Sequence, residues 1–160
     1  MQSIDDIYQK YAQMVYRYLL SLTHNSDLAE ELTQETFYQA IKSIHKYDES
    51  CKISTWLCAI AKRQVLAYYR KHPKVDEIED VSILYPSAEV EVMDAMGQME
   101  LLKQLHACSE PFREILYLRI FGNLSFRDIG EIVGKTENWA RVTYYRGKEK
   151  LRRELEDNEI

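Results

Sequence analysis

Glycine, proline and cysteine are scarce in this 160-residue chain, which holds only 5, 3 and 3 of them. So few turn-forming residues, beside many Leu, Ile, Ala, Glu and Lys, favour a mainly helical protein. The three cysteines are odd in number and form no CxxC pair. We therefore interpret them as free thiols in a reducing compartment, not as a disulfide framework or a zinc site.

Long apolar runs are also missing. No stretch of about 18 apolar residues occurs, which argues against a membrane-spanning helix. The N-terminal MQSIDDIYQK lacks the basic and apolar regions of a signal peptide. Because 46% of the residues are hydrophobic, the chain can still bury a core. We expect a cytoplasmic globular protein without direct membrane insertion.

The net charge of −5 conceals an uneven distribution. Residues 1–72 carry 9 basic and 8 acidic side chains, residues 73–94 carry 1 and 7, and residues 95–160 carry 11 of each. Within 135–153 there are 7 basic and only 2 acidic residues. DNA affinity depends on the face that meets the phosphates, so a net negative chain can still bind DNA.

The acidic stretch 73–94 divides the chain. It contains two prolines and no sustained helical period, and we interpret it as a linker. A long surface loop within one domain is the alternative, but loops of this length are uncommon in compact domains. The predicted fold class is all-α, with small helical domains at 1–72 and 95–160 joined by this acidic linker.

Apolar residues at three- and four-residue spacing predict helices at 4–23, 27–44 and 54–71 before the linker. Asp27 is the predicted N-cap of the second helix, with Glu30 completing a capping box. The predicted core is Ile7, Tyr11, Met14, Val15, Tyr18, Leu19, Leu22, Leu28, Leu32, Phe37, Ala40, Ile41, Trp56, Leu57, Ile60, Ala61 and Leu66.

After the linker we predict helices at 92–108 and 110–121, the first with Met96, Met99, Leu102 and Leu105 on its apolar face. A short helix at 126–133 follows, capped by Ser125, and Gly134 supplies a left-handed turn. Thr136 caps the last helix, which runs to about 155. A short helix, a tight turn and a longer basic helix are typical of a helix-turn-helix that reads the DNA major groove.

The last helix separates into two faces. Ala140, Tyr144, Gly147 and Leu151 should pack against Phe126, Ile129 and Val133, while Asn138, Arg141, Val142, Tyr145 and Lys148 face outward. Arg141 is the predicted main base reader because arginine can bind guanine through two hydrogen bonds. Asn138, Val142 and Tyr145 would support it, and Arg146, Lys148 and Arg127 suit phosphates. The alternative is a helical hairpin whose basic face is only solvated. Trp139 is expected to pack between the helices, with a place at the groove edge as its alternative.

Two further surfaces lie before the linker. Lys52, Ser54, Lys62, Arg63 and Arg70 accompany Tyr68 and Tyr69, and such a mixture of cations and aromatics suits single-stranded nucleic acid. Half-buried core tyrosines are the equally simple alternative. Glu31, Gln34, Glu35 and Gln39 share one face of the second helix, for which solvation is the ordinary explanation.

Three segments together resemble the extracytoplasmic-function, or group IV, sigma factors of bacterial RNA polymerase. DLAEELTQETFYQAI is similar to the family's polymerase-binding helix. YDESCKISTWLCAIAKRQVLAYYRK is similar to its promoter-melting segment, with STWLxxIA at 54–61. EPFREILYLRIFGNLSFRDIGEIVGKTENWARVTYYRGKEKLR is similar to its C-terminal domain. The resemblance covers all but the linker, and its motifs occur in the family's order.

The resemblance implies roles by position. Glu31, Gln34 and Glu35 would contact the β′ clamp helices of core RNA polymerase, and the C-terminal domain would meet the β flap. The loop 48–53, with Lys52, Ser54, Lys62 and Arg63, would bind the −10 element and capture a flipped base. Asn138, Arg141, Val142, Tyr145, Arg146 and Lys148 would bind the −35 element. An anti-sigma protein is the expected regulator.

Two other classes of function are the alternatives. In a stand-alone helix-turn-helix regulator, residues 1–72 would form a dimerisation or ligand domain, and the protein would bind duplex DNA without polymerase, usually as a symmetric dimer. The cations around STWL argue against this, because they are unsuited to the core of a dimer interface. An enzyme is disfavoured because the four histidines are scattered and no HExxH, GxSxG or phosphate-binding glycine loop occurs. We predict no catalytic residue, no metal and no cofactor.

Overall fold

The computed structural model describes residues 3–73 and 92–158, and over these ranges all regular secondary structure is helical. The N-terminal half contains α1 (Ile4–Thr23), α2 (Ser26–Ser43), the 3-10 turn η1 (Ile44–Lys46) and α3 (Ile53–Lys71). The C-terminal half contains α4 (Val92–Ala107), α5 (Phe112–Ile120), α6 (Phe126–Val133) and α7 (Glu137–Asn158). The all-α prediction is confirmed, whereas nearly all of the predicted linker lies outside the described residues. None of the described helices is both long and apolar enough to cross a bilayer.

Side-chain caps set the starts of four helices. The capping oxygens accept backbone N–H groups in four pairs, namely Ser3 with Asp6 at 3.2 Å, Asn25 with Leu28 at 3.1 Å, Ser125 with Asp128 at 3.1 Å and Thr136 with Trp139 at 3.0 Å. The predicted caps Ser125 and Thr136 are confirmed, and Gly134 ends α6 with φ 74° as predicted. The prediction of Asp27 as a cap is wrong. Asn25 caps α2, and Asp27 lies in the first turn, where its charge favours the helix N-terminus.

The predicted core of the N-terminal half is largely confirmed, with two errors. Ile41 is 52% and Leu66 is 50% exposed. The buried face of α2 includes Thr33 and Thr36, whose hydroxyls donate to backbone carbonyls one turn earlier at 2.6 and 2.7 Å. Hydroxyls that donate within their own helix can be buried. The buried face of α2 therefore includes these two threonines, and Ile41 lies outside it. In α3, Val65 is buried in place of Leu66.

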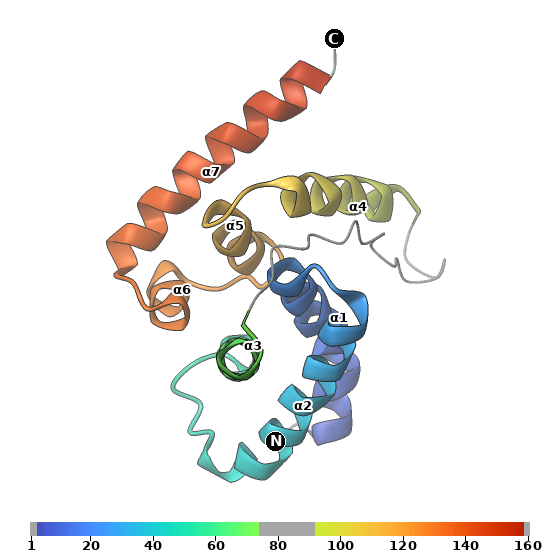
Figure 1. The fold of residues 1–160 in the computed structure, drawn as a ribbon, viewed down its shortest axis with the longest axis vertical. Helices are drawn as coiled ribbons and strands as arrows, with labels where there is room; N and C mark the ends of the chain where they lie inside the picture. The colour runs from blue at the N-terminus through green and yellow to red at the C-terminus, as the bar shows by residue number, and fades with distance from the viewer. Residues whose placement is uncertain (1–2, 74–91, 159–160) are drawn as a thin grey trace.

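The C-terminal half packs around α5. Leu102 and Leu105 of α4 are buried, and the side chain of Met96 lies outside the described residues. α5 starts two residues later than predicted, with Pro111 as its N-cap residue. Figure 1 shows α4 and α5 next to each other, with α7 extending away from the rest of the molecule.

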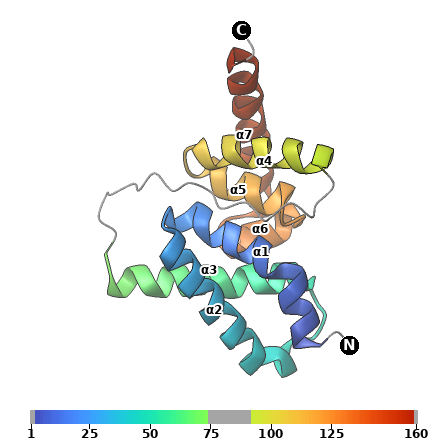
Figure 2. The same cartoon turned by 90° about the vertical axis from the view of Figure 1, so that its right-hand side faces the viewer.

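Two pairs of helices make most of the backbone contact between the two halves. α5 packs on α1, and α6 packs on α3. Figures 1 and 2, two views at right angles, both place α5 and α6 between α7 and the N-terminal helices. The two predicted domains, residues 1–72 and 95–160, therefore share an interface.

Candidate nucleic-acid and polymerase interface

The first turns of α7 present a continuous exposed face. Asn138 and Arg141 are exposed, Val142 is 38% exposed and Tyr145 is 55% exposed. Ala140 and its buried neighbours lie on the opposite side. The predicted division of α7 into an outward and an inward face is confirmed, although the roles of the outward residues remain predictions.

Among the described residues, Arg141 contacts two groups of its own half, Glu137 and Phe126. A guanidinium nitrogen lies 3.4 Å from a carboxylate oxygen of Glu137, one turn earlier, and both side chains are about half exposed. The guanidinium also lies 5.4 Å from the ring centroid of Phe126. An exposed pair of this kind contributes little to stability, so a stronger acceptor can displace the carboxylate.

Two glycines let α7 approach its neighbours. A Cβ on Gly147 would lie 3.2 Å from Phe112 atoms and 3.3 Å from a Leu116 methyl, so this glycine seats α7 on α5. A Cβ on Gly130 would lie 2.8 and 2.9 Å from the carbonyl oxygens of Lys135 and Thr136. Gly130 thus lets α6 pass close to the turn that contains Lys135 and Thr136. The sequence pattern of α6 gave no indication of this role.

Aromatic contacts support the same unit. The guanidinium of Arg119 lies 4.2 Å from the ring centroid of Phe126, and Nη1 of Arg119 donates to the carbonyl of Leu124 at 2.9 Å. Trp139 is partly buried, with the Lys135 ammonium 5.6 Å from its ring centroid. These contacts fix the turn and α6 against α5. Sequence reasoning missed Arg119 because it precedes the helix-turn-helix pattern.

The polar face of α2 is accessible. Glu31 and Gln34 are exposed, and Glu35 is partly exposed and accepts a hydrogen bond from the Gln39 amide at 2.9 Å. Tyr38, 55% exposed, continues the row toward the end of the helix. The three predicted polymerase contacts therefore lie together on one open face.

The loop before α3 has internal supports. The Tyr47 hydroxyl donates to the carbonyl of Cys51, and the Tyr47 ring packs 5.1 Å from the Trp56 ring, centroid to centroid. A carboxylate oxygen of Asp48 accepts the backbone N–H of Ser50 at 3.0 Å. Hydrogen bonding with the Ser50 side chain, and next to it this backbone bond, lowers the pKa of Asp48. The loop is thus held at both ends, beside the predicted −10 residues.

The predicted −10 residues do not share one environment. Arg63 is exposed and lines a cavity of about 610 Å³ between α3 and α6, whereas Ser54 is partly buried. The Lys52 ammonium donates to the Asn123 carbonyl at 2.9 Å. Lys62, predicted to face DNA, instead points to α5, where its ammonium lies 2.8 and 3.0 Å from the carboxylate oxygens of Glu114.

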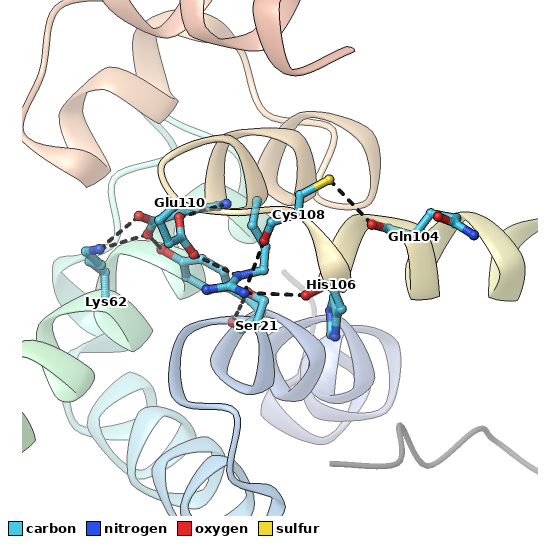
Figure 3. Close-up of polar contacts among 9 residues, drawn as sticks. Ser21, Lys62, Gln104, His106, Cys108 and Glu110 are labelled. Atoms are coloured by element: carbon cyan, nitrogen blue, oxygen red, sulfur yellow. Dashed lines mark hydrogen bonds and ion pairs between the residues drawn. The ribbon is translucent and has the colours of Figure 1, made fainter. Parts of the chain in front are cut away.

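A buried polar network surrounds this ion pair. The side chains of Lys62 and Glu114 are 18% and 11% exposed, and the Tyr18 hydroxyl donates to the same carboxylate at 2.7 Å. Close by, the Tyr117 hydroxyl donates to the Met14 carbonyl at 2.7 Å. Burial, and next to it the charge of Glu114, raises the pKa of Tyr18 well above its usual range. Tyr18 is therefore a permanent donor. Figure 3 shows Lys62 reaching across to the C-terminal half.

Sequence reasoning could not have found Glu114. It lies in the first turn of α5, and its partners are 52 and 96 residues away. Within the described ranges, no group of three or more His, Cys, Asp or Glu side chains could hold a metal ion.

Comparison with known proteins gives the class of protein. The model of the sigma-70 region 2 family matches residues 7–74. The chain is 34% identical over 159 residues to the ECF RNA polymerase sigma factor SigM of Bacillus subtilis, covering 94% of this chain and 93% of that protein. It is 30% identical over 161 residues to the RNA polymerase sigma factor CarQ of Myxococcus xanthus, covering 99% and 92%.

A solved structure has the same fold. The sigma factor RpoE from Bartonella quintana, in complex with the anti-sigma factor NepR, matches with a TM-score of 0.69 at 22% identity, covering 94% of this chain and 97% of that chain. The matches define a sigma-70-type transcription initiation factor. Within that class, the chain belongs to the extracytoplasmic-function sigma factors of bacterial RNA polymerase, which direct core polymerase to promoters. The family resemblance is confirmed, and the stand-alone regulator is set aside.

Proposed function

We propose that this sigma factor reads the −35 element with α7. The observation that carries the proposal is the exposed row Asn138, Arg141, Val142 and Tyr145 on the first turns of a helix that α5 and α6 hold rigidly. Donors, acceptors and apolar groups in such a row can read base edges in the major groove. Arg146, Lys148 and Arg127, also exposed, would neutralise flanking phosphates.

The −10 element is assigned to the loop 48–53 and the start of α3. Lys52, Ser54, Lys62 and Arg63 would hold the strand, and a flipped base would enter beside the supported loop. Residues 1–72 thus act as the −10 and polymerase-binding domain, and residues 95–160 as the −35 domain. Because the two elements lie far apart on a promoter, both domains can bind only if the halves separate.

The acidic face of α2 is the proposed contact with core polymerase. Glu31, Gln34 and Glu35 would meet the β′ clamp helices, and the C-terminal half would meet the β flap. Carboxylates on an open face suit a basic partner surface, because charge complementarity steers association and fixes orientation.

Control by an anti-sigma protein is part of the proposal. It follows from family membership and from the solved relative RpoE, whose partner is the anti-sigma factor NepR. The expected site of action is the cytoplasm, where core polymerase is found, and the expected role is recognition and strand opening without chemistry of its own.

Run-off transcription with purified core polymerase tests the proposal directly, with a promoter fragment from upstream of the protein's own gene. A specific transcript that depends on this chain is expected, and its start site gives positions for both elements. Polymerase that is active with another sigma factor but silent with this chain, on a fragment that the chain binds alone, would contradict the proposal.

The polymerase contact is tested separately. Glu35→Lys should weaken core binding by on the order of 2 kcal/mol, because it places a cation against a basic surface. Glu49→Lys makes the same charge change at an exposed position in the loop before α3, outside α2, and is the matched control. Equal core binding by both variants would remove this face from the interface.

A further inference from the structure

The cavity of about 610 Å³ between α3 and α6 is built by both halves of the chain. Its walls carry an aromatic ring, two guanidinium groups and two carboxylates, which belong to Trp56, Arg63, Arg127, Asp128 and Glu131. Proteins commonly bind small ligands in cavities of about 300–1,000 Å³ that lie between domains and carry a few polar groups. The chemistry of the two walls then indicates which ligand fits.

The wall formed by α3 offers a stacking surface and an available cation. The partly exposed Trp56 ring packs against the Tyr47 ring, with their centroids 5.1 Å apart, so its orientation is supported. Arg63 is exposed, and its guanidinium makes no hydrogen bond or ion pair with the described residues. Aromatic rings stack on bases, and a guanidinium binds a phosphate through parallel hydrogen bonds. This wall therefore suits a nucleotide better than an apolar molecule.

The wall formed by α6 adds a second cation and a fixed carboxylate. Arg127 lies 3.8 Å from Glu131, and both side chains are more than two-thirds exposed, at 78% and 71%, so a phosphate can displace this carboxylate. Asp128 is partly buried, and the Thr55 hydroxyl donates to one of its carboxylate oxygens at 3.2 Å. That hydrogen bond fixes the carboxylate in the wall, and its two oxygens can still accept further N–H groups.

A fixed carboxylate discriminates among the bases, because an ionised carboxylate only accepts hydrogen bonds. Guanine presents two adjacent donors on its Watson–Crick edge, the ring N–H and the 2-amino group. On the same edge, adenine and cytosine place an acceptor beside the amino group, and uracil places carbonyl oxygens on both sides of its N–H. One carboxylate can accept both donors of guanine and is repelled by an acceptor of every other base. Stacking combined with reading of this edge is a recurring way to bind an unpaired base.

We propose that this cavity binds a free guanine nucleotide, with the base stacked on Trp56 and read by Asp128, and with the phosphate held by Arg63 and Arg127. Such a site is separate from promoter recognition. Arg63 and Arg127 are also assigned to promoter phosphates, but Trp56 and Asp128 are not. The preference for one base therefore tests the cavity independently of the proposed function.

The first test is calorimetric titration of the full chain with guanosine, inosine and adenosine monophosphates. The three share the sugar and the phosphate, and the inosine compound lacks only the 2-amino group of guanine. The guanosine compound should bind most tightly, the inosine compound more weakly, and the adenosine compound on the order of tenfold more weakly than the guanosine compound. Equal affinity for all three would mean that an anion binds without base reading and would overturn the proposal. Failure of all three to bind would overturn it as well.

Asp128→Asn should shift the preference toward adenine. An amide presents one acceptor and one donor, the pattern that lets amide side chains bind adenine. Affinity for guanosine monophosphate should fall and affinity for adenosine monophosphate should rise, each by about three- to tenfold. A folding defect cannot produce the rise. Glu100→Gln removes the same charge from α4, where Glu100 accepts a hydrogen bond from Gln104, and should change neither affinity. Equal losses for both nucleotides in Asp128→Asn, or the same shift in Glu100→Gln, would overturn the proposal.

Tryptophan fluorescence locates the base. The chain has two tryptophans, so Trp139→Phe leaves Trp56 as the only one, and guanosine monophosphate should quench its emission. Unquenched Trp56 in protein that calorimetry shows to be saturated would place the nucleotide elsewhere and overturn the proposal. A single-stranded trinucleotide with a central guanine that binds as tightly as the free nucleotide would assign the cavity to a strand and overturn it too. If promoter-specific transcription depends on this chain but no nucleotide binds, only the nucleotide site is wrong.

Discussion

The cations on the two proposed DNA surfaces have different partners. On α7, Arg141 is paired with Glu137 one turn away, and Arg146 and Lys148 are exposed. On α3, Lys52 and Lys62 are held by groups of the opposite half. Both surfaces are basic in sequence, yet Lys62 of α3 can meet a phosphate only after Glu114 moves away, whereas the cations named on α7 are exposed.

The two surfaces therefore differ in how accessible their cations are to phosphates, and not in their basic composition. Local pairs at i and i+4 are exposed and easily exchanged, whereas a buried pair between halves resists exchange until the halves move. Four substitutions or conditions can break or sharpen this contrast, beginning with the largest expected effect.

Gly130→Ala should damage the α7 surface and leave the α3 surface intact. The new Cβ would lie 2.8 Å from a backbone carbonyl oxygen that cannot move without shifting the turn. We expect a loss of about 3 kcal/mol in the free energy of unfolding, measured in urea. Gly97→Ala on α4, where a Cβ meets nothing within 4 Å, is the control and should stabilise by up to about 1 kcal/mol. Equal stability of the two variants would show that the turn adapts.

His106 tests the joint between the halves. Burial, aided by the charges of His24, Arg113 and Arg17, lowers its pKa from 6.5 to about 4, and its Nε2 is buried without a hydrogen-bond partner. The unfolded chain binds the proton more readily, so the stability from neutral His106 is fully present above about pH 6.5 and is lost as the pH falls toward 4. Compared with His106→Gln, the unaltered protein should lose on the order of 2–3 kcal/mol more between pH 7 and pH 4. Urea unfolding at the two pH values measures this, and parallel losses would contradict it.

Arg141→Ala tests base reading by α7. Loss of a bidentate contact with guanine should weaken −35 binding by roughly 1–3 kcal/mol and relax the preference at one base pair. Core polymerase binding should stay unchanged. Arg152→Ala, near the end of α7 where Glu149 and Glu156 hold the guanidinium, is the matched control. If both variants lose affinity equally in a competition assay, Arg141 contributes charge and no base reading.

Lys148→Ala should have the smallest effect. A phosphate contact carries no sequence information, so affinity should fall by a similar small amount for every promoter. The slope of log affinity against log salt should decrease in magnitude by about 1. Salt titrations of the unaltered and substituted proteins on two different promoter fragments measure this, and a loss on one fragment alone would point to base contact.

The sequence predicted those features that depend on neighbours along the chain. Ser125, Gly134 and Thr136 were found because caps and turns obey local rules. Asn25 was missed as a cap because Asp27 offers an equally good pattern two residues later. Ile41 was wrongly placed in the core because a threonine-lined buried face leaves no apolar signal.

The environment of Lys62 could not be predicted for a different reason. Its position on α3 and its charge were both read correctly, but its partner Glu114 is fixed only when α5 packs on the N-terminal helices. Contacts between distant segments depend on the tertiary fold, and a periodic apolar pattern says nothing about which polar residue will lie opposite. The exposed face of α7 was predictable because its partners are local.

The supported loop before α3 has a kinetic consequence. With the Tyr47 hydroxyl on the Cys51 carbonyl and Asp48 on the Ser50 amide, the backbone is already shaped before a strand arrives. Ordering a free loop would cost on the order of 1 kcal/mol per residue at the moment of contact. A preorganised loop avoids this cost. Once the halves are apart, the rate of base capture would then be limited by how often the base leaves the duplex, and not by the ordering of the loop.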